Sequence, residues 1–362
     1  MIAQSGEPLL YPRVGPRSSL KAKLWPAVHA VIRCPGRLEE TVVKTAFRVV
    51  AFWAACMLAG ASGAQDWPQK PIHFVVAFAP GGPTDIIARL VGHKLTETFG
   101  QQVVVENRGG AGGNIATVAV AKSAPDGYTA LVTTSAFAVN VSLFSNPGYN
   151  PERDFIPVIA PATQPNMIVV HASVPAATLG EFINQSRDKK LAFASPGAGT
   201  TPHLTGEYVL RVLAKLDIAA VHFRGAGPAV AALVAGEPPV GSMAISGPLS
   251  QVKAGKLRVL AVSSAKRIAV LPDVPTLAEA GFPGVEDYTW VGIFLPAGTP
   301  AGIVQKLNEA INRAIESPDV RERLEAQAFD PLGGPQARFA EYVKAEIAKW
   351  GRVVREANIK VE

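Results

Sequence analysis

Cysteine is almost absent from this chain, and its two copies, Cys34 and Cys56, both lie within the first 64 of 362 residues. The rest of the chain therefore offers no disulfide, no zinc-thiolate site and no cysteine nucleophile. Charged residues make up only 18% of the sequence and aromatic residues 7%, while 48% of the residues are hydrophobic. This balance excludes a disordered or collagen-like chain and indicates folded α/β material.

A membrane-spanning run is also missing near the N-terminus. The apolar run 49–61 has 13 residues, fewer than the roughly 20 that a spanning helix needs. It follows Lys44 and Arg48 and ends in the small residues 62–64. This pattern predicts a Sec signal peptide at about 43–64 and export to the periplasm. We do not expect lipidation of Cys56, because no aliphatic residue stands three places before it.

The segment upstream of the signal peptide contains five prolines between residues 1 and 41 and has no helical or strand periodicity. We therefore interpret 1–64 as a leader with an over-extended start, the true start being near Val43. The leader carries most of the net charge of +6, and residues 65–362 have a net charge of only +1. The basic pI of about 9.3 thus does not indicate a nucleic-acid partner.

The part after residue 64 alternates short apolar runs with amphipathic stretches, which predicts an α/β fold with parallel strands and crossover helices. The apolar positions Ile87, Leu90, Val91 and Leu95 form one face of a helix that Gly100 should end. A glycine-rich turn (ENRGGAGGN) opens a further helix through Val118 and Ala121, and the other predicted helices are 179–186, 203–215, 226–234, 303–315 and 339–354. The predicted strands are 71–78, 103–105, 128–134, 156–159, 167–170, 191–194, 219–221, 257–262 and 288–295.

About 300 residues exceed what one sheet comfortably holds, so we expect two lobes with a ligand cleft between them. We predict lobe 1 to comprise 65–166 and 287–362, and lobe 2 to comprise 167–286, with hinge segments near Asn166 and Asp287.

Motifs for catalysis and metal binding are missing from the sequence. No HExxH, CxxC or GxSxG occurs, the histidines lack metal-pair spacing, and the glycine-rich turns fit neither a Walker loop nor a dinucleotide fingerprint. Ser195 with the nearby His203 leaves a secreted serine hydrolase open as an alternative. The favoured prediction is a binding protein that is not an enzyme and has no metal or cofactor.

Three turns at the ends of predicted strands carry the binding hypothesis. The turn 79–85 (APGGPTD) places glycines before a helix, so that free backbone N–H groups and the positive end of the helix dipole can attract a carboxylate. The turn 133–135 (TTS) brings hydroxyl groups to the end of another strand, and the turn 195–203 (SPGAGTTPH) combines glycines and hydroxyls at a further helix start. Together these turns favour reversible binding of a carboxylate.

The stretch 67–129 around FAPGGPTD and NRGGAGGN, with the later blocks FASPGAGTTPHLTGE, FRGAGPAVAALVAGE and LPDVPTLAEAGFPG, resembles the Bug (TctC-like) receptors of tripartite tricarboxylate transporters. The likeness runs in order from Trp67 to Glu362. It implies a periplasmic binding protein of the type II kind, a monomer that closes on a small carboxylate and delivers it to membrane transporter subunits. A receptor for a two-component signalling system would have the same sequence features and stays an alternative.

The resemblance also implies the ligand-binding residues. They come from both predicted lobes: Ala79, Pro80, Gly81, Gly82, Thr84, Asp85, Thr134, Ser135, Asn166, Ser195, Gly199, Thr200, Thr201, His203 and Met243.

One of these positions departs from the family. Many members have an aspartate where this chain has Met243, and methionine cannot pair with an ammonium group. We therefore expect a ligand without an amino group: a di- or tricarboxylate, a hydroxy acid or an aromatic acid.

Overall fold

The computed structural model describes residues 67–356 of the chain, which lie within one compact unit, Asp66–Glu362. The predicted leader lies outside the described residues. Among the residues described, no helix combines the length and hydropathy needed to cross a bilayer.

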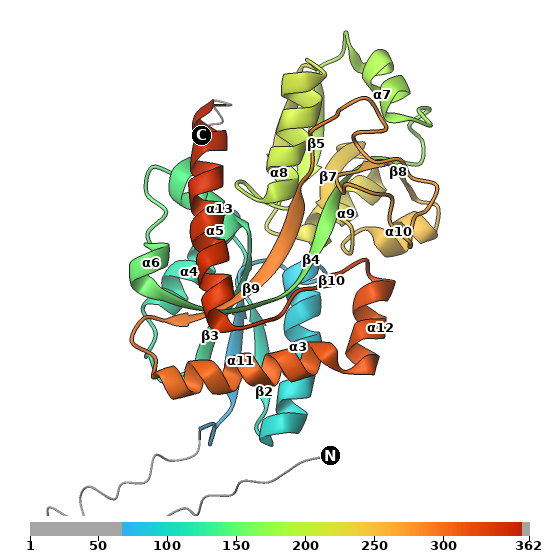
Figure 1. The fold of residues 1–362 in the computed structure, drawn as a ribbon. Helices are drawn as coiled ribbons and strands as arrows, with labels where there is room; N and C mark the ends of the chain where they lie inside the picture. Colours follow the sequence, from blue (N-terminus) through green and yellow to red (C-terminus); the bar gives the residue numbers. More distant parts are fainter. Residues whose placement is uncertain (1–66, 357–362) are drawn as a thin grey trace, which may run out of the picture. The chain divides into compact units, whose positions relative to one another are not determined.

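Strands and helices alternate along the described part of the chain (Figure 1). The strands are β1 Ile72–Val76, β2 Val103–Asn107, β3 Thr129–Thr134, β4 Phe155–His171, β5 Leu191–Ser195, β6 Ile218–His222, β7 Val240–Ala244, β8 Leu257–Val262, β9 Tyr288–Pro296 and β10 Asp330–Pro331. The helices are α3 Pro83–Phe99, α4 Asn114–Ala121, α5 Ala136–Leu143, α6 Pro151–Asp154, α7 Leu179–Ser186, α8 Thr201–Gly206, α9 Ala226–Ala235, α10 Leu249–Lys253, α11 Ala301–Glu316, α12 Pro318–Ala326 and α13 Gln336–Glu356, with a 3₁₀ turn η2 at Ala111–Gly113 and a π-helix η3 at Glu207–Leu213.

The strands form two lobes that share the long strand β4. Strands follow the order β2-β1-β3-β9-β4-β7-β5-β6, with β8 and β10 also pairing β4. The outer strands run parallel to their neighbours, as predicted, whereas β9 is antiparallel to both β3 and β4, and β4 is antiparallel to β7 and β8. Hence the α/β prediction is confirmed, but the sheet is mixed where the lobes join.

Strand β4 covers two runs that were predicted as separate strands, 156–159 and 167–170. It is continuous over 17 residues, and Pro157, Pro161 and Pro165 all lie within it. Its pairing with β9 shifts register after Pro157 and after Ile159, and such bulges accommodate residues that cannot donate to the ladder. The strand changes partners near Asn166, from β9 in the first lobe to β7 and β8 in the second.

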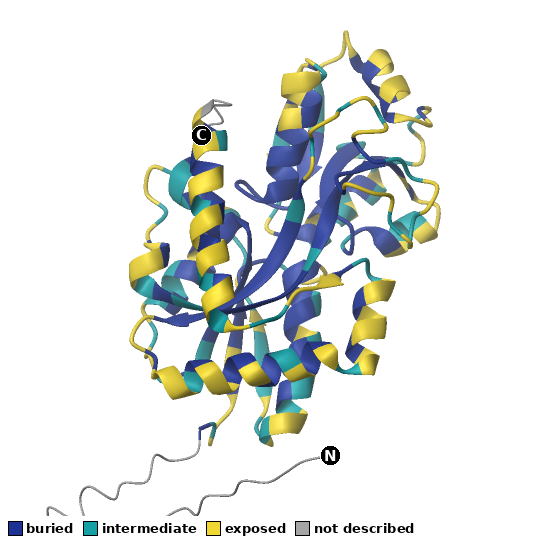
Figure 2. Cartoon of the chain, viewed as in Figure 1, coloured by how far each residue is buried: buried dark blue, intermediate teal, exposed yellow. Residues whose placement is uncertain are grey.

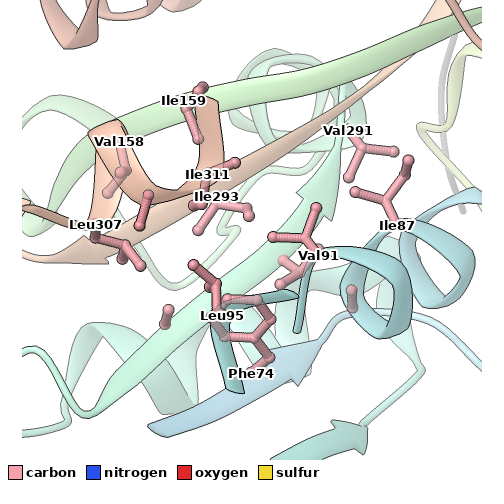
Figure 3. Close-up of a cluster of buried hydrophobic side chains, with 14 of the residues drawn as sticks. Phe74, Ile87, Val91, Leu95, Val158, Ile159, Val291, Ile293, Leu307 and Ile311 are labelled. Carbon is pink, nitrogen blue, oxygen red and sulfur yellow. The ribbon is translucent and has the colours of Figure 1, made fainter. Parts of the chain in front are cut away.

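Each lobe has its own apolar core, and the buried residues follow the strands of both (Figure 2). In the first lobe, the predicted stripe of α3 packs with α11 against β1, β4 and β9 (Figure 3). Helix α3 ends, as predicted, where Gly100 takes a left-handed conformation with φ 65°. The last helix, α13, packs on α5 and β4 of the same lobe.

A buried carboxylate fastens α13 to strand β9. Glu346 Oε2 accepts hydrogen bonds from the indole N–H groups of Trp290 and Trp350, each at 3.0 Å. All three side chains are buried. Removing the carboxylate would leave two buried donors without acceptors, and each such donor costs about 1–3 kcal/mol.

We predict that Glu346→Leu lowers the free energy of unfolding by about 2–4 kcal/mol, because both indole N–H groups lose their acceptor. Urea denaturation followed by tryptophan fluorescence measures this change. The matched control is Glu341→Leu on the same helix, where the carboxylate is exposed and contacts only Lys344. Equal losses in the two variants would contradict the structural role of Glu346.

Candidate functional site

The N-terminus of α3 carries backbone donors that the protein itself does not use. Gly82 occupies the N-cap position and supplies no side chain, and Pro83 follows as the first helical residue. No side chain caps the N–H groups of the first turn. Such unsatisfied N–H groups, together with the helix dipole, attract an anion.

Two side chains in this first turn have different roles. Asp85 accepts a hydrogen bond from Gly81 N–H at 3.1 Å and forms an ion pair with Arg89 at 2.9 Å, so it holds the turn and its charge is balanced. Thr84 is 1% exposed, and its Oγ1 has no hydrogen-bond partner. A buried hydroxyl without a partner is costly, which points to a ligand atom as its partner.

The second lobe presents the turn between β5 and α8. The Ser195 hydroxyl and the N–H of Gly197 close this turn at 3.2 Å. Thr200 caps α8 by accepting from His203 N–H and donates its own proton to the Gly197 carbonyl at 2.7 Å. The turn is therefore fixed by its own side chains, as the glycine-and-hydroxyl pattern predicts.

A small cavity lies where these two turns meet. Its volume is about 20 Å³, enough for about one water molecule. The lining residues come from both lobes: Phe78, Gly82, Pro83, Thr84, Thr134, Pro196, Thr200, Pro202, Ala226, Ala244 and Thr289. A carboxylic acid of four to six carbons would need the lobes to separate.

The lobes touch around this cavity mainly through backbone and glycine. Ala79 N–H donates to the Arg224 carbonyl at 2.8 Å, and Ser135 Oγ lies 3.1 Å from Thr201 Oγ1. A Cβ atom on Gly112 would collide with the Ala198 carbonyl oxygen of the other lobe. Similar collisions would follow at Gly109, Gly199, Gly225 and Gly227. We name this set of glycine contacts the glycine seam, and it allows close approach of the lobes.

The predicted site residues separate into three groups. Gly82, Thr84, Thr134 and Thr200 line the cavity. Six others support its walls or lie in the contact between the lobes: Ala79, Pro80, Gly81, Asp85, Ser135 and Gly199. Asn166, Ser195, Thr201 and His203 are buried behind the lining and are engaged in hydrogen bonds within the protein.

Met243 differs from its predicted place. Its side chain is fully buried in the apolar core of the second lobe, among Met167 and Leu233, and does not line the cavity. Because side chains alternate along β7, its neighbour Ala244 faces the cavity instead. The side chain of β7 that a ligand would meet is thus that of Ala244, not Met243. Like methionine, alanine cannot pair with an ammonium group.

Ser195 and His203 do not form a catalytic pair. His203 Nδ1 accepts from Gly199 N–H at 3.2 Å, and its Nε2 lies 4.0 Å from Glu207. Burial, with contributions from His222 and Arg211, lowers the pKa of His203 to about 3, so the imidazole is neutral. Both ring nitrogens of His203 thus face groups other than Ser195. The Ser195 hydroxyl instead accepts from the N–H of Gly197 within the turn. This geometry argues against the hydrolase alternative.

Within residues 67–356 there is no cluster of His, Cys, Asp and Glu able to hold a metal ion.

A polar cluster occupies the junction of the lobes. Asn166 Nδ2 donates to Asp287 Oδ2 at 2.9 Å, and Thr205 Oγ1 lies 2.8 Å from the same oxygen. The pKa of Asp287 is raised to about 7: burial is the largest cause and Glu346 adds to it, whereas Thr205 and Lys349 act in the opposite direction. Asp287 also lines a second cavity of about 430 Å³ beside Trp350.

Several lining residues were not predicted from the sequence. Pro196 and Pro202 lie within the predicted turn 195–203, and Ala226 lies within FRGAG, at the start of a predicted helix, but the sequence did not single them out as lining residues. Phe78 and Thr289 lie in or beside predicted strands, and only the pairing of β9 with β3 and β4 brings Thr289 to the cavity.

Comparison with known proteins identifies the family of the chain. The family model described as the tripartite tricarboxylate transporter family receptor matches residues 87–359. A "UPF0065 protein in tcbD-tcbE intergenic region" from Pseudomonas sp. strain P51 is 39% identical over 86% of this chain and 94% of its own length.

Two solved structures extend the comparison. Rpa4515 from R. palustris with adipate is 35% identical, with a TM-score of 0.79, over 82% of this chain and 99% of its own. MatC from Rhodopseudomonas palustris with bound malate is 36% identical, with a TM-score of 0.75, over 80% of this chain and all of its own.

We predict that the contribution of Asp287 to stability falls as the pH rises from about 4 to 7, because folded Asp287 keeps its proton to about pH 7 whereas the unfolded chain releases it near 3.8. Asp287→Asn removes this titration. The melting temperature of the variant minus that of the wild type should therefore increase by several degrees between pH 4.5 and pH 8. Differential scanning calorimetry measures it, with the exposed Asp188→Asn as control. A difference that stays constant with pH would contradict the burial argument.

Proposed function

Because the chain belongs to the tripartite tricarboxylate transporter receptor family, it is a solute-binding protein and not an enzyme, and we propose that it captures a small di- or tricarboxylate between its lobes. The observation that carries this proposal is the uncapped N-terminus of α3 beside the buried, unpartnered hydroxyl of Thr84. Both supply donors toward one cavity that residues of the two lobes line.

The absence of charged residues from the described cavity lining supports an anionic ligand that has no amino group. Among the described residues that line it, none is acidic and none is basic. An ammonium group would be buried without a counter-charge there, which is costly. A carboxylate, in contrast, can be held by N–H groups and hydroxyls. The adipate and malate in the two solved relatives are in keeping with such a ligand.

Closure of the lobes is the second element of the proposal. The cavity of about 20 Å³ is too small for a dicarboxylate, so entry requires opening, and the glycine seam then lets the lobes approach again. We place the hinges near Asn166 and Asp287, which divides the mature chain into 65–166 with 287–362 and 167–286. The change of partners along β4 near Asn166 supports this division.

The site residues of the proposal are those that the cavity and its walls bring together. Thr84, Thr134 and the first turn of α3 would contact the carboxylate, while Thr200 closes the site from the second lobe. The transport role follows from the family: the ligand-loaded protein, a periplasmic monomer after removal of the leader, would pass its ligand to the membrane subunits of a tripartite transporter.

Isothermal titration calorimetry on residues 65–362 tests the function directly. We expect dicarboxylates of four to six carbons, malate and adipate among them, to bind with a micromolar or lower Kd, and glutamate to bind at least about 100-fold more weakly. Thr84→Val should weaken dicarboxylate binding about tenfold, because one charge-assisted hydrogen bond is lost. Preferential binding of glutamate, or no binding of any carboxylate, would overturn the proposal.

A pair of glycine variants tests closure. Gly112→Ala should weaken dicarboxylate binding more than tenfold, because its methyl group would collide with the Ala198 carbonyl across the glycine seam. The control is Gly100→Ala, which has nearly the same backbone conformation (φ 65° against 62°) but nothing within 4 Å. Both variants should lose about 1 kcal/mol of stability from the left-handed conformation. Unchanged affinity in Gly112→Ala would contradict closure along this seam.

A further inference from the structure

A chain of buried hydroxyl groups runs from the first lobe through the junction of the lobes. Ser135 Oγ lies 3.1 Å from Thr201 Oγ1, and Thr201 Oγ1 lies 2.8 Å from Thr289 Oγ1. Thr289 Oγ1 in turn lies 2.7 Å from Asn166 Oδ1. All four side chains are at most 2% exposed.

Asn166 determines the direction of every bond in this chain. Its Nδ2 faces Asp287 Oδ2 at 2.9 Å and Thr205 Oγ1 at 3.3 Å, so its Oδ1 faces Thr289 and can only accept. Thr289 must therefore donate its single proton to Asn166. Thr201 must then donate to Thr289, and the same reasoning makes Ser135 the donor to Thr201.

The consequence for the cavity is that Thr289 presents only an acceptor. Its proton is committed to Asn166, one lone pair accepts from Thr201, and one lone pair remains. Thr200 on the neighbouring wall is likewise an acceptor, because its proton goes to the Gly197 carbonyl. Both residues line the cavity.

The other two hydroxyl groups of the lining, those of Thr84 and Thr134, are donors, and together with the first turn of α3 we name them the donor wall. Thr84 Oγ1 has no partner, so its proton is free for a ligand. Thr134 Oγ1 accepts from Ala136 N–H at 3.2 Å, and within the described part of the chain nothing takes its own proton. The uncapped first turn of α3 lies on this same wall. A carboxylate fits the donor wall, whereas a second carboxylate placed against Thr289 would meet lone pairs.

We propose that this site selects hydroxylated carboxylates: the carboxylate binds the donor wall of Thr84 and Thr134, and a hydroxyl group of the ligand donates to Thr289. This inference rests on the proposed function and narrows its substrate class. Asn166 is a positioning residue, because it keeps the Thr289 proton out of the cavity without touching the ligand. Thr289 is the residue that determines specificity.

Two ligand pairs that differ by one hydroxyl group test the inference on residues 65–362. They are L- and D-malate against succinate, and citrate against tricarballylate. Calorimetry should show at least one hydroxylated member binding about 3- to 10-fold more tightly than its partner, the value of one net hydrogen bond. Thr289→Val should abolish this preference by weakening only the hydroxylated member.

Two further variants separate a specificity role from a structural one. Thr289→Ser retains the hydroxyl group and should keep the preference. Thr163→Val removes a hydroxyl group that donates to the Thr289 backbone carbonyl at 3.3 Å and lies outside the cavity lining, so it should leave the preference unchanged. Equal binding within both pairs, or a preference that survives in Thr289→Val, overturns the inference while the proposed function stands. No binding of any of these acids, nor of adipate, overturns both.

Discussion

The antiparallel pair of β4 and β9, with the side-chain cluster at its end, is the feature on which the rest of the structure depends. The two strands pair from Phe155 with Pro296 to Pro165 with Tyr288, and beyond this point β4 continues into the second lobe. Asn166 and Asp287 lie where the pairing ends, joined by a hydrogen bond of 2.9 Å. The cavity walls from both lobes are therefore positioned relative to one short stretch of backbone.

Attraction for an anion in this protein is local. Residues 65–362 have a net charge of only +1, and among the described residues that line the cavity none carries a charge. The positive potential comes from the N–H groups and dipole at the start of α3, while Asp85 is neutralised by Arg89. Such a site can release its ligand readily, because no buried ion pair has to be broken when the lobes open.

Much of the fold could be predicted because local patterns agree with it. The stripe of α3, its end at Gly100, and the position of β8 follow from the sequence. The continuity of β4 could not be predicted, since Pro157, Pro161 and Pro165 normally break a strand, and only the bulged pairing with β9 accommodates them. Residues 203–215 were predicted as a helix, which includes η3, but no pattern in the sequence predicts that η3 is a π-helix.

In the site, too, features set by local sequence could be predicted, and features set by strand pairing could not. The turn 79–85 and the cap at Thr200 were predictable, because glycine and hydroxyl patterns act over a few residues. The roles of Thr289 and Ala244 were not, since they depend on strand pairing and on which face of β7 meets the cavity. Asn166 was predicted to lie near a hinge and to bind the ligand, but its side chain is buried and its Oδ1 accepts from Thr289.

A crystal structure of residues 65–362 with a bound dicarboxylate tests the central claim most directly. We predict one carboxylate within hydrogen-bond distance of Thr84 Oγ1 and the N–H groups of the first turn of α3, with Thr289 and, from the second lobe, Thr200 also in contact with the ligand. A carboxylate held instead by a lysine or arginine side chain, or a ligand that contacts only one lobe, would contradict it.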